Sequence, residues 1–170
     1  EFYDGKFYTV NKTKITKEEL IEFYKYLIKK YPIISIEDAA SENDIETIKT
    51  LTKEIGDKIM LVGDDYFVTN ITYLKQGIED NYNNSILLKA NQIGTISEML
   101  LTIKLAKDHN FKTIISHRSG ETEDTFISDL AVGLNLGYIK TGSLSRGERI
   151  AKYNQLLRIE EQLDNKTWNM

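Results

Sequence analysis

The sequence contains no cysteine, and this absence excludes disulfide bonds and thiolate chemistry. It has no apolar stretch of the kind that crosses a membrane or serves as a signal peptide. It also has no long basic run, and the formal net charge is −4, so nucleic acid is not an evident partner. These absences fit a cytoplasmic protein. The 170 residues suffice for one domain with a sizeable core.

What the chain does contain is a regular alternation of apolar strand-like runs and amphipathic helical segments. Near-continuous apolar strands separated by helices are typical of a parallel sheet that helices cover. The even spacing of the strands favours β/α-barrel units. A doubly wound sheet stays open on pattern alone, although no Gly-x-Gly-x-x-Gly or P-loop motif supports it. The predicted strands are residues 33–36, 59–62, 85–88, 112–116 and 138–140, and the predicted helices are 16–31, 44–55, 69–78, 95–103, 126–134 and 145–163.

A hairpin is predicted for residues 1–10, around Asp4-Gly5. A closed eight-stranded β/α barrel typically takes about 250 residues. This chain offers only about five regular βα units after the hairpin and the first helix. We therefore expect an α/β fold that is the C-terminal portion of a TIM-like barrel, incomplete on its own.

Residues 116–124 read Ser-His-Arg-Ser-Gly-Glu-Thr-Glu-Asp and follow an apolar strand. His117, Arg118 and Ser119 should therefore project in succession from the tip of that strand. The arginine offers a planar fork for phosphate or carboxylate. The serine and nearby amides can add anion contacts at a helix start. A polar turn that binds nothing is the alternative interpretation.

A charged or polar side chain follows every predicted strand of the sheet. In β/α barrels the active site lies at the C-terminal ends of the strands, so five side chains are expected around one mouth: Glu37, Asp64, Lys89, His117 and Lys140. Taken singly, each acidic pair after a strand could be a helix cap. The two lysines could equally lie on the surface with their ammonium groups in water. The apolar bodies of the strands favour the active-site interpretation.

Two carboxylates from neighbouring strands suit a hard cation such as Mg²⁺, which usually keeps waters and substrate oxygens as further ligands. Zinc is not expected, because the chain has no cysteine and only two histidines. Carboxylates, a metal ion, two lysines and an arginine together indicate a polyanionic substrate. Metal-assisted proton abstraction beside a carboxylate fits this set, with a lysine as the base.

The sequence resembles the enolase family over nearly its whole length. The family's reaction is the reversible, Mg²⁺-dependent dehydration of 2-phosphoglycerate to phosphoenolpyruvate, so the resemblance implies a lyase of glycolysis and gluconeogenesis. A lysine or histidine base with one or two Mg²⁺ ions is an established pattern of this superfamily and not a deduction from these residues. The segments that carry the resemblance are long and collinear: Ser35–Asp38, Val62–Asp65 with Val68–Asn70, Leu88–Thr95, Ser116–Asp124, Ile139–Gly142 and Ala151–Glu160.

The resemblance implies a role for the residues at the strand ends. Glu37 and Asp64 match two of the three carboxylate ligands of the first Mg²⁺ ion. Lys89 matches the base that accepts the proton from C2 of 2-phosphoglycerate. Lys140 matches the second active-site lysine, at the carboxylate end of the substrate.

The same resemblance covers the polar stretch after the fourth strand of the sheet. Arg118 and Ser119 match ligands of the substrate's phosphate group, and His117 lines the same site. Two departures from the family's pattern are Ala39, where proline is usual, and Ala90, where valine is common. Neither departure removes a functional group.

Several parts of the family's active site have no counterpart in residues 1–170: the third metal carboxylate, the glutamate that acts on the leaving hydroxyl group, the serine and histidine of the lid, and the N-terminal α+β domain. We therefore expect this chain to be the C-terminal part of the catalytic barrel domain, inactive and marginally stable alone. The complete protein is expected to be a cytoplasmic homodimer or larger oligomer, with a cell-surface location as a further family-based expectation. A non-catalytic binding protein and an inactive paralogue are the alternatives. The intact charged residues argue against the second.

Overall fold

The computed structural model describes residues 2–163. No helix in this range is long and apolar enough to cross a membrane. The described residues form a small antiparallel hairpin, a parallel sheet and the helices around it. In chain order the elements are β1 (Tyr8–Val10), β2 (Thr13–Ile15), α1 (Lys17–Lys30), β3 (Ser35–Glu37), α2 (Ile45–Ile55), β4 (Met60–Gly63), α3 (Ile71–Glu79), β5 (Ser85–Leu88), α4 (Ile96–Asp108), β6 (Lys112–Ser116), α5 (Phe126–Gly133), β7 (Gly137–Lys140) and α6 (Gly147–Gln162).

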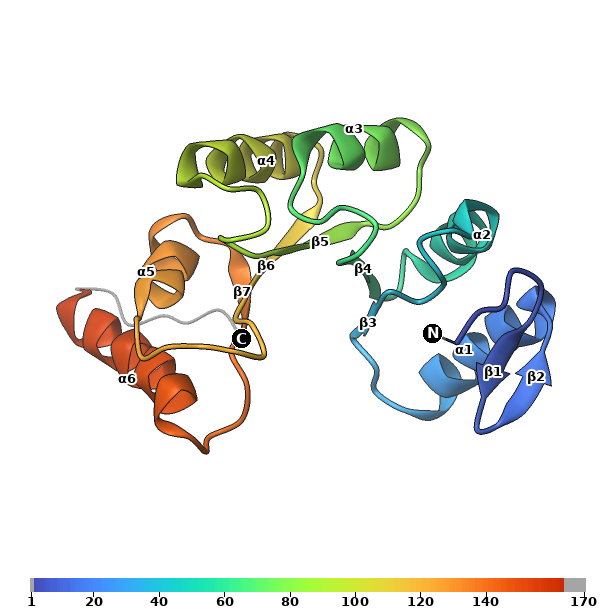
Figure 1. Ribbon diagram of the computed structural model, residues 1–170, viewed down its shortest axis with the longest axis horizontal. Coiled ribbons are helices and arrows are strands. Elements are labelled where there is room, and N and C mark those ends of the chain that lie inside the picture. The colour runs from blue at the N-terminus through green and yellow to red at the C-terminus, as the bar shows by residue number, and fades with distance from the viewer. Residues whose placement is uncertain (1, 164–170) are drawn as a thin grey trace.

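The strands of the parallel sheet lie in chain order, β3-β4-β5-β6-β7. A doubly wound sheet reverses its strand order at a switch point, so this order excludes that alternative and confirms the prediction of barrel units. A helix connects each strand to the next, and the sheet curls into an arc with β3 and β7 at its two ends (Figure 1). Over the described residues the fold is thus an incomplete α/β barrel.

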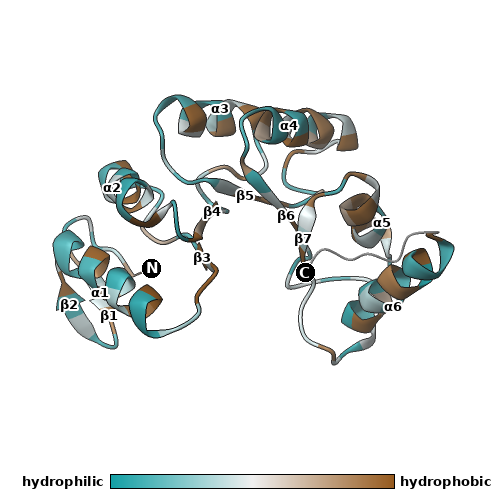
Figure 2. Ribbon diagram, turned by 180° about the vertical axis from the view of Figure 1, so that it is seen from behind, coloured by the Kyte–Doolittle hydropathy of each residue, from teal (hydrophilic) through white to brown (hydrophobic). Residues whose placement is uncertain are grey.

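The helices cover the convex side of the arc and enclose the main hydrophobic core. Successive residues of a strand point to opposite faces of the sheet. Leu61, Ile86 and Ile115 accordingly belong to the core beneath the helices, whereas Val62 and Leu87 belong to a smaller cluster. Figure 2 shows hydrophobic residues along the strands and in stripes on the helices. Both faces of the central strands are buried, which explains their near-continuous apolar sequences.

A regular hairpin that was not predicted follows the one predicted around Asp4-Gly5. β1 and β2 pair in antiparallel register and are joined through Asn11 and Lys12, whose φ angles are 49° and 66°. Two successive residues with positive φ suit a two-residue hairpin, because they match the twist of the strands. A lysine gives no sequence signal for this conformation. The predicted turn at residues 4–5 is present as a separate turn, beside an isolated bridge between Tyr3 and Tyr8.

Side-chain caps set several of the helix starts. Thr16 caps α1 in a full capping box, which agrees with the predicted start of this helix. Thr95 caps α4, but its hydroxyl group also donates to the carboxylate of Glu98 at 2.6 Å. The prediction that Ser145 begins the last helix was wrong. Arg146 occupies the cap position of α6 with a φ angle of 76° and makes no side-chain cap bond.

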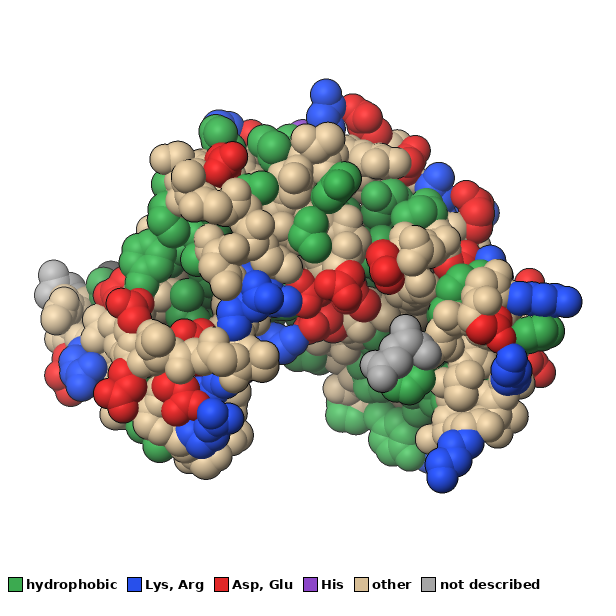
Figure 3. Space-filling model, in the orientation of Figure 1, with side chains coloured by type: hydrophobic (Ala, Val, Ile, Leu, Met, Phe, Trp, Pro, Cys, Tyr) green, Lys and Arg blue, Asp and Glu red, His purple; other side chains and the backbone are tan. Residues whose placement is uncertain are grey.

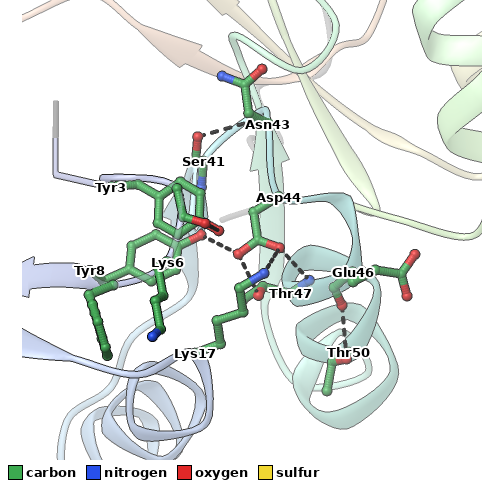
Figure 4. Close-up of polar contacts among 12 residues, drawn as sticks. Tyr3, Lys6, Tyr8, Lys17, Ser41, Asn43, Asp44, Glu46, Thr47 and Thr50 are labelled. Atoms are coloured by element: carbon green, nitrogen blue, oxygen red, sulfur yellow. Dashed lines mark hydrogen bonds and ion pairs between the residues drawn. The ribbon is translucent and has the colours of Figure 1, made fainter.

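A buried carboxylate joins the hairpin, α1 and α2. Asp44 is 3 % exposed and accepts hydrogen bonds from the hydroxyl of Tyr8 at 2.9 Å and from that of Thr47 at 2.8 Å. The ammonium group of Lys17 lies 2.8 Å from the other oxygen (Figure 4). Burial opposes the charge of Asp44, yet these donors outweigh it and lower the pKa below its ordinary value. Asp44 thereby anchors three elements at the β3 end of the arc.

Candidate functional site

The C-terminal ends of the parallel strands lie along one edge of the sheet, and charged residues there form two ion pairs. In the first, Lys140 at the end of β7 places Nζ 2.8 and 2.6 Å from the two carboxylate oxygens of Glu37 at the end of β3. These residues are 103 positions apart and belong to the two ends of the arc. The curl of the sheet therefore brings its first and last strands to a common mouth. On the face drawn in Figure 3, acidic and basic side chains meet at the centre of the arc.

The second ion pair lies deeper in the mouth. Lys89 follows β5, and its Nζ donates to Oδ2 of Asp64, which follows β4, at 2.5 Å. The side chains of this pair are 14 % and 11 % exposed, against 44 % and 35 % for Lys140 and Glu37. The surface interpretation is therefore wrong for Lys89. Two charges this deeply buried are tolerated because each has the other as a partner.

Asp64 also belongs to a group of three carboxylates. Among the residues that the structure describes, one oxygen each of Asp38, Asp64 and Asp65 lies within 4.8 Å of the others. Asp38 accepts the backbone N–H groups of Asp64 at 2.9 Å and of Asp65 at 3.2 Å. Burial and the neighbouring negative charges nevertheless raise the pKa of Asp38 to about 6. Asp38 therefore keeps its negative charge less readily than an exposed aspartate does.

This acidic group fits a hard cation. Oδ1 of Asp64 is buried and has no hydrogen-bond partner in the described part of the chain. A buried polar atom of this kind is costly unless an ion or ligand meets it, and carboxylate oxygens are ligands that Mg²⁺ prefers. Glu37 lies outside the group, with both oxygens on Lys140. The helix-cap interpretation of these acids was wrong, because Asp44 and Asn70 cap the following helices.

The loop after β4 fixes the backbone of Lys89. The hydroxyl oxygen of Thr69 accepts the N–H group of Lys89 at 2.9 Å and donates to Gln92 at 2.7 Å. The carbonyl oxygen of Thr69 accepts a bond from Thr102 at 2.9 Å. Thr69 has a φ angle of 61°, which non-glycine residues rarely adopt, and these bonds hold it there. The sequence gives no local signal for this role of Thr69, because its contact with Lys89 is made by the fold.

Residues 117–125 form an irregular loop between β6 and α5. Nη1 of Arg118 donates to Oδ1 of Asn91 at 2.8 Å, so the guanidinium group lies beside the segment that follows Lys89. Ser119 is exposed. Because α5 begins only at Phe126, Ser119 does not lie at a helix start, contrary to the prediction.

His117 joins this loop to β7. Its backbone N–H group donates to the carbonyl oxygen of Lys140 at 2.9 Å. Burial lowers the pKa of the imidazole below its ordinary value, and the positive charges of Arg149 and Lys140 act in the same direction. These surroundings favour the neutral ring, in which one nitrogen can donate a hydrogen bond and the other can accept one.

Two residues of α6 take part in this region without any signal in the sequence pattern. Arg149 and Lys152 are buried, and both donate to backbone carbonyl groups of the 117–125 loop. Their partners are 31 and 30 positions away in the chain. In the sequence they occupy ordinary positions of a polar helix, so only the fold shows what they contact.

A family model described as the C-terminal TIM barrel domain of enolase matches residues 1–169. The chain belongs to this enolase family. The curled parallel sheet agrees with the barrel that the description names. In barrels of this kind the active site lies at the C-terminal ends of the strands, which is where the two lysine–carboxylate pairs of this enolase-family chain are found.

Proposed function

We propose that this chain supplies active-site residues of an enolase, a hydro-lyase that reversibly dehydrates 2-phospho-D-glycerate to phosphoenolpyruvate with Mg²⁺ as cofactor. The observation that carries the proposal is the meeting of Lys89, Asp64, Lys140 and Glu37 at one mouth in a member of the enolase family. The activity is proposed for the complete protein. None of the residues assigned here is the acid that protonates the leaving hydroxyl group.

Asp64 and Glu37 would hold the Mg²⁺ ion. The unpartnered Oδ1 of Asp64 supports the assignment of Asp64. Glu37 is assigned from its match to the family's ligand position. When bound, the ion would stabilise negative charge on the carboxylate of the substrate. Glu37 would then be released from Lys140, which would leave this lysine free to contact the substrate.

Lys89 would accept the proton from C2. General base catalysis needs a base held within hydrogen-bonding reach of the proton that it removes. The burial of Lys89 and its backbone bond to Thr69 support such a fixed position. In the ion pair with Asp64, Lys89 is the donor, so it would serve as a base only when Asp64 is engaged elsewhere.

The anionic ends of the substrate would be bound by the remaining residues. Arg118 and Ser119 would bind the phosphate group, for which the guanidinium fork is well suited. Lys140 would meet the carboxylate end. His117, whose surroundings favour the neutral ring, would contribute a hydrogen bond rather than a charge.

Exchange of the C2 proton with solvent, measured beside a binding titration, tests these roles in the complete protein. Lys89→Ala should abolish the exchange of the 2-phosphoglycerate proton, because the base is lost. It should largely preserve binding, since the phosphate contacts involve other residues. Lys140→Ala should weaken the binding of the substrate and lower turnover without removing the base. Lys104→Ala is a matched control, because this lysine lies on the surface of α4 and pairs with Asp108.

The exchange rates decide between the assignments. If Lys89→Ala exchanged the C2 proton at nearly the wild-type rate, Lys89 would not be the base, and Lys140 or His117 would become the candidates. If wild-type protein showed neither exchange nor binding of 2-phosphoglycerate, the proposed activity itself would be wrong.

A further inference from the structure

The loop that carries Arg118 and Ser119 has no regular secondary structure, so other contacts must fix its course. Its backbone carbonyl groups at Arg118, Ser119 and Thr122 accept bonds from two side chains of α6. Loops without such support sample many conformations, and a binding site needs its ligands held close to the productive geometry. The contacts with α6 therefore fix the conformation of this loop.

Arg149 supplies the first of these contacts. Its Nη1 donates to the carbonyl oxygen of Arg118 at 2.8 Å, and its Nη2 donates to that of Ser119 at 3.1 Å. The side chain is only 7 % exposed. The planar fork thus bonds two consecutive carbonyl groups, which a lysine cannot do with the same geometry.

The stem of Arg149 is also tightly enclosed. A Cβ atom at Gly142 would lie 3.0 Å from Cδ of Arg149 and 3.2 Å from Cε1 of His117. Gly142 has a φ angle of +82°, and its carbonyl oxygen accepts a bond from the hydroxyl of Tyr153 on α6. The guanidinium group is therefore held between the two loops that follow β6 and β7.

Lys152 supplies the second contact. Its side chain is 1 % exposed, and its Nζ donates to the carbonyl oxygen of Thr122. The same Nζ lies 3.6 Å from Oε1 of Glu121. Glu121 in turn accepts the N–H groups of Arg118 at 3.1 Å and of Thr122 at 3.0 Å. Lys152 thus lies beside the carboxylate of Glu121, which itself bonds two backbone N–H groups of the loop.

Acidic side chains lie beside both cations, and one of these acids, Glu148, also pairs with Arg146 at 2.8 Å. The two cations face Glu121 and also Glu148, whose Oε1 lies 3.7 Å from Nε of Arg149. Buried charges cost desolvation energy, and paired charges of this kind often contribute little net stability. Their specific bonds to three loop carbonyl groups point to a geometric role.

We propose that Arg149 and Lys152 are positioning residues that hold the loop so that Arg118 and Ser119 face the phosphate group of the substrate. The proposal rests on the proposed function, in which Arg118 and Ser119 bind phosphate. Neither residue of α6 contacts the substrate in this arrangement. Each acts through the backbone of the loop.

The test compares two ligands of the complete protein, 2-phosphoglycerate and D-glycerate, which lacks the phosphate group. Arg149→Lys keeps the charge but loses the fork, and it should bind 2-phosphoglycerate about tenfold more weakly while binding D-glycerate as the wild type does. Lys152→Met, of similar length but uncharged, should show the same pattern. Arg158→Lys is the matched control on α6, where the arginine is exposed and donates to Gln155, and it should change neither affinity.

Each outcome of the titrations is decisive. Wild-type affinity for 2-phosphoglycerate in Arg149→Lys would overturn the positioning role, as would an equal loss for both ligands. If Lys152→Met failed to fold, Arg149→Lys would decide alone, because it preserves charge and nearly preserves volume. If the wild type did not bind 2-phosphoglycerate, the proposed function would fail and this inference with it, an outcome visible before any variant is measured.

Discussion

Two aspartates in the segment between β3 and α2, Asp44 buried and Asp38 half-buried, have opposite surroundings. Asp44 is met by donors from Tyr8, Lys17 and Thr47, and its pKa lies below the ordinary value. Burial and, to a smaller extent, two neighbouring carboxylates raise the pKa of Asp38 to about 6. Where the fold supplies enough donors, a buried carboxylate serves as an anchor. Where it does not, as at Asp38, the carboxylate keeps its negative charge less readily.

The largest effect on stability is expected from the anchor. Asp44→Ala should lower the free energy of unfolding by about 3 kcal/mol, because it removes a helix cap and leaves the buried hydroxyl of Tyr8 without its acceptor. Denaturant unfolding of the complete protein at fixed concentration measures this loss. Affinity for the substrate should be unchanged, because the partners of Asp44 lie on the hairpin, α1 and α2. If Asp44→Ala lost as much affinity for the substrate as Arg149→Lys, Asp44 would not be a purely structural residue separate from the binding site.

A smaller effect on stability is expected at Asp38, and its dependence on pH is opposite to that of Asp44. Its folded-state pKa is raised above the ordinary 3.8, so protonated Asp38 contributes stability that is complete below about pH 4 and disappears as the pH rises through about 6. Asp44, whose pKa is lowered, contributes stability at neutral pH that is lost on acidification.

Asp38→Asn isolates the contribution of this one group. In metal-free buffer the wild type should lose stability relative to Asp38→Asn between pH 4 and pH 6. The difference should be at most about 1 kcal/mol, because the group is partly exposed and solvent screens it. Thermal unfolding of both proteins across this range measures the difference. Parallel pH profiles would show that the carboxylates around Asp38 do not disfavour its charge.

The smallest effect is expected at an exposed acid that also has a cationic partner. Asp4 pairs with Lys14 at 2.6 Å, and both side chains are largely exposed. Asp4→Asn should leave the unfolding midpoint unchanged, because surface ion pairs are screened by water and salt. A loss comparable with that of Asp44→Ala would mean that burial does not distinguish the two aspartates.

Local signals in the sequence were enough for most of the fold. The apolar runs at 85–88 and 112–116 coincide with β5 and β6. Threonine and aspartate caps located the starts of α1 and α2, because a cap depends on residues within one helical turn. The start of α6 was misplaced, since Arg146 adopts a positive φ that no residue type there signals.

Only part of the candidate site could be predicted from the sequence. Lys89 and Asp64 could be predicted as site residues, because a charged residue directly after an apolar strand is a local sequence pattern. The support from Arg149 and Lys152 has no such pattern, since their partners lie about thirty positions away and are met only when α6 packs beneath the loop. Long-range contacts of this kind depend on the tertiary structure and not on neighbouring residues.

We propose that the acidic group at the strand ends, where Oδ1 of Asp64 has no hydrogen-bond partner among the described residues, binds a divalent cation. Calorimetric titration of Mg²⁺ into the complete protein tests it without any need for turnover. Asp64→Asn should weaken the binding of Mg²⁺ at least about tenfold, because it removes a charge from a hard-cation site. Asp108→Asn, on the surface of α4, should bind Mg²⁺ as the wild type does. Equal Mg²⁺ affinity in the wild type and Asp64→Asn would contradict the account.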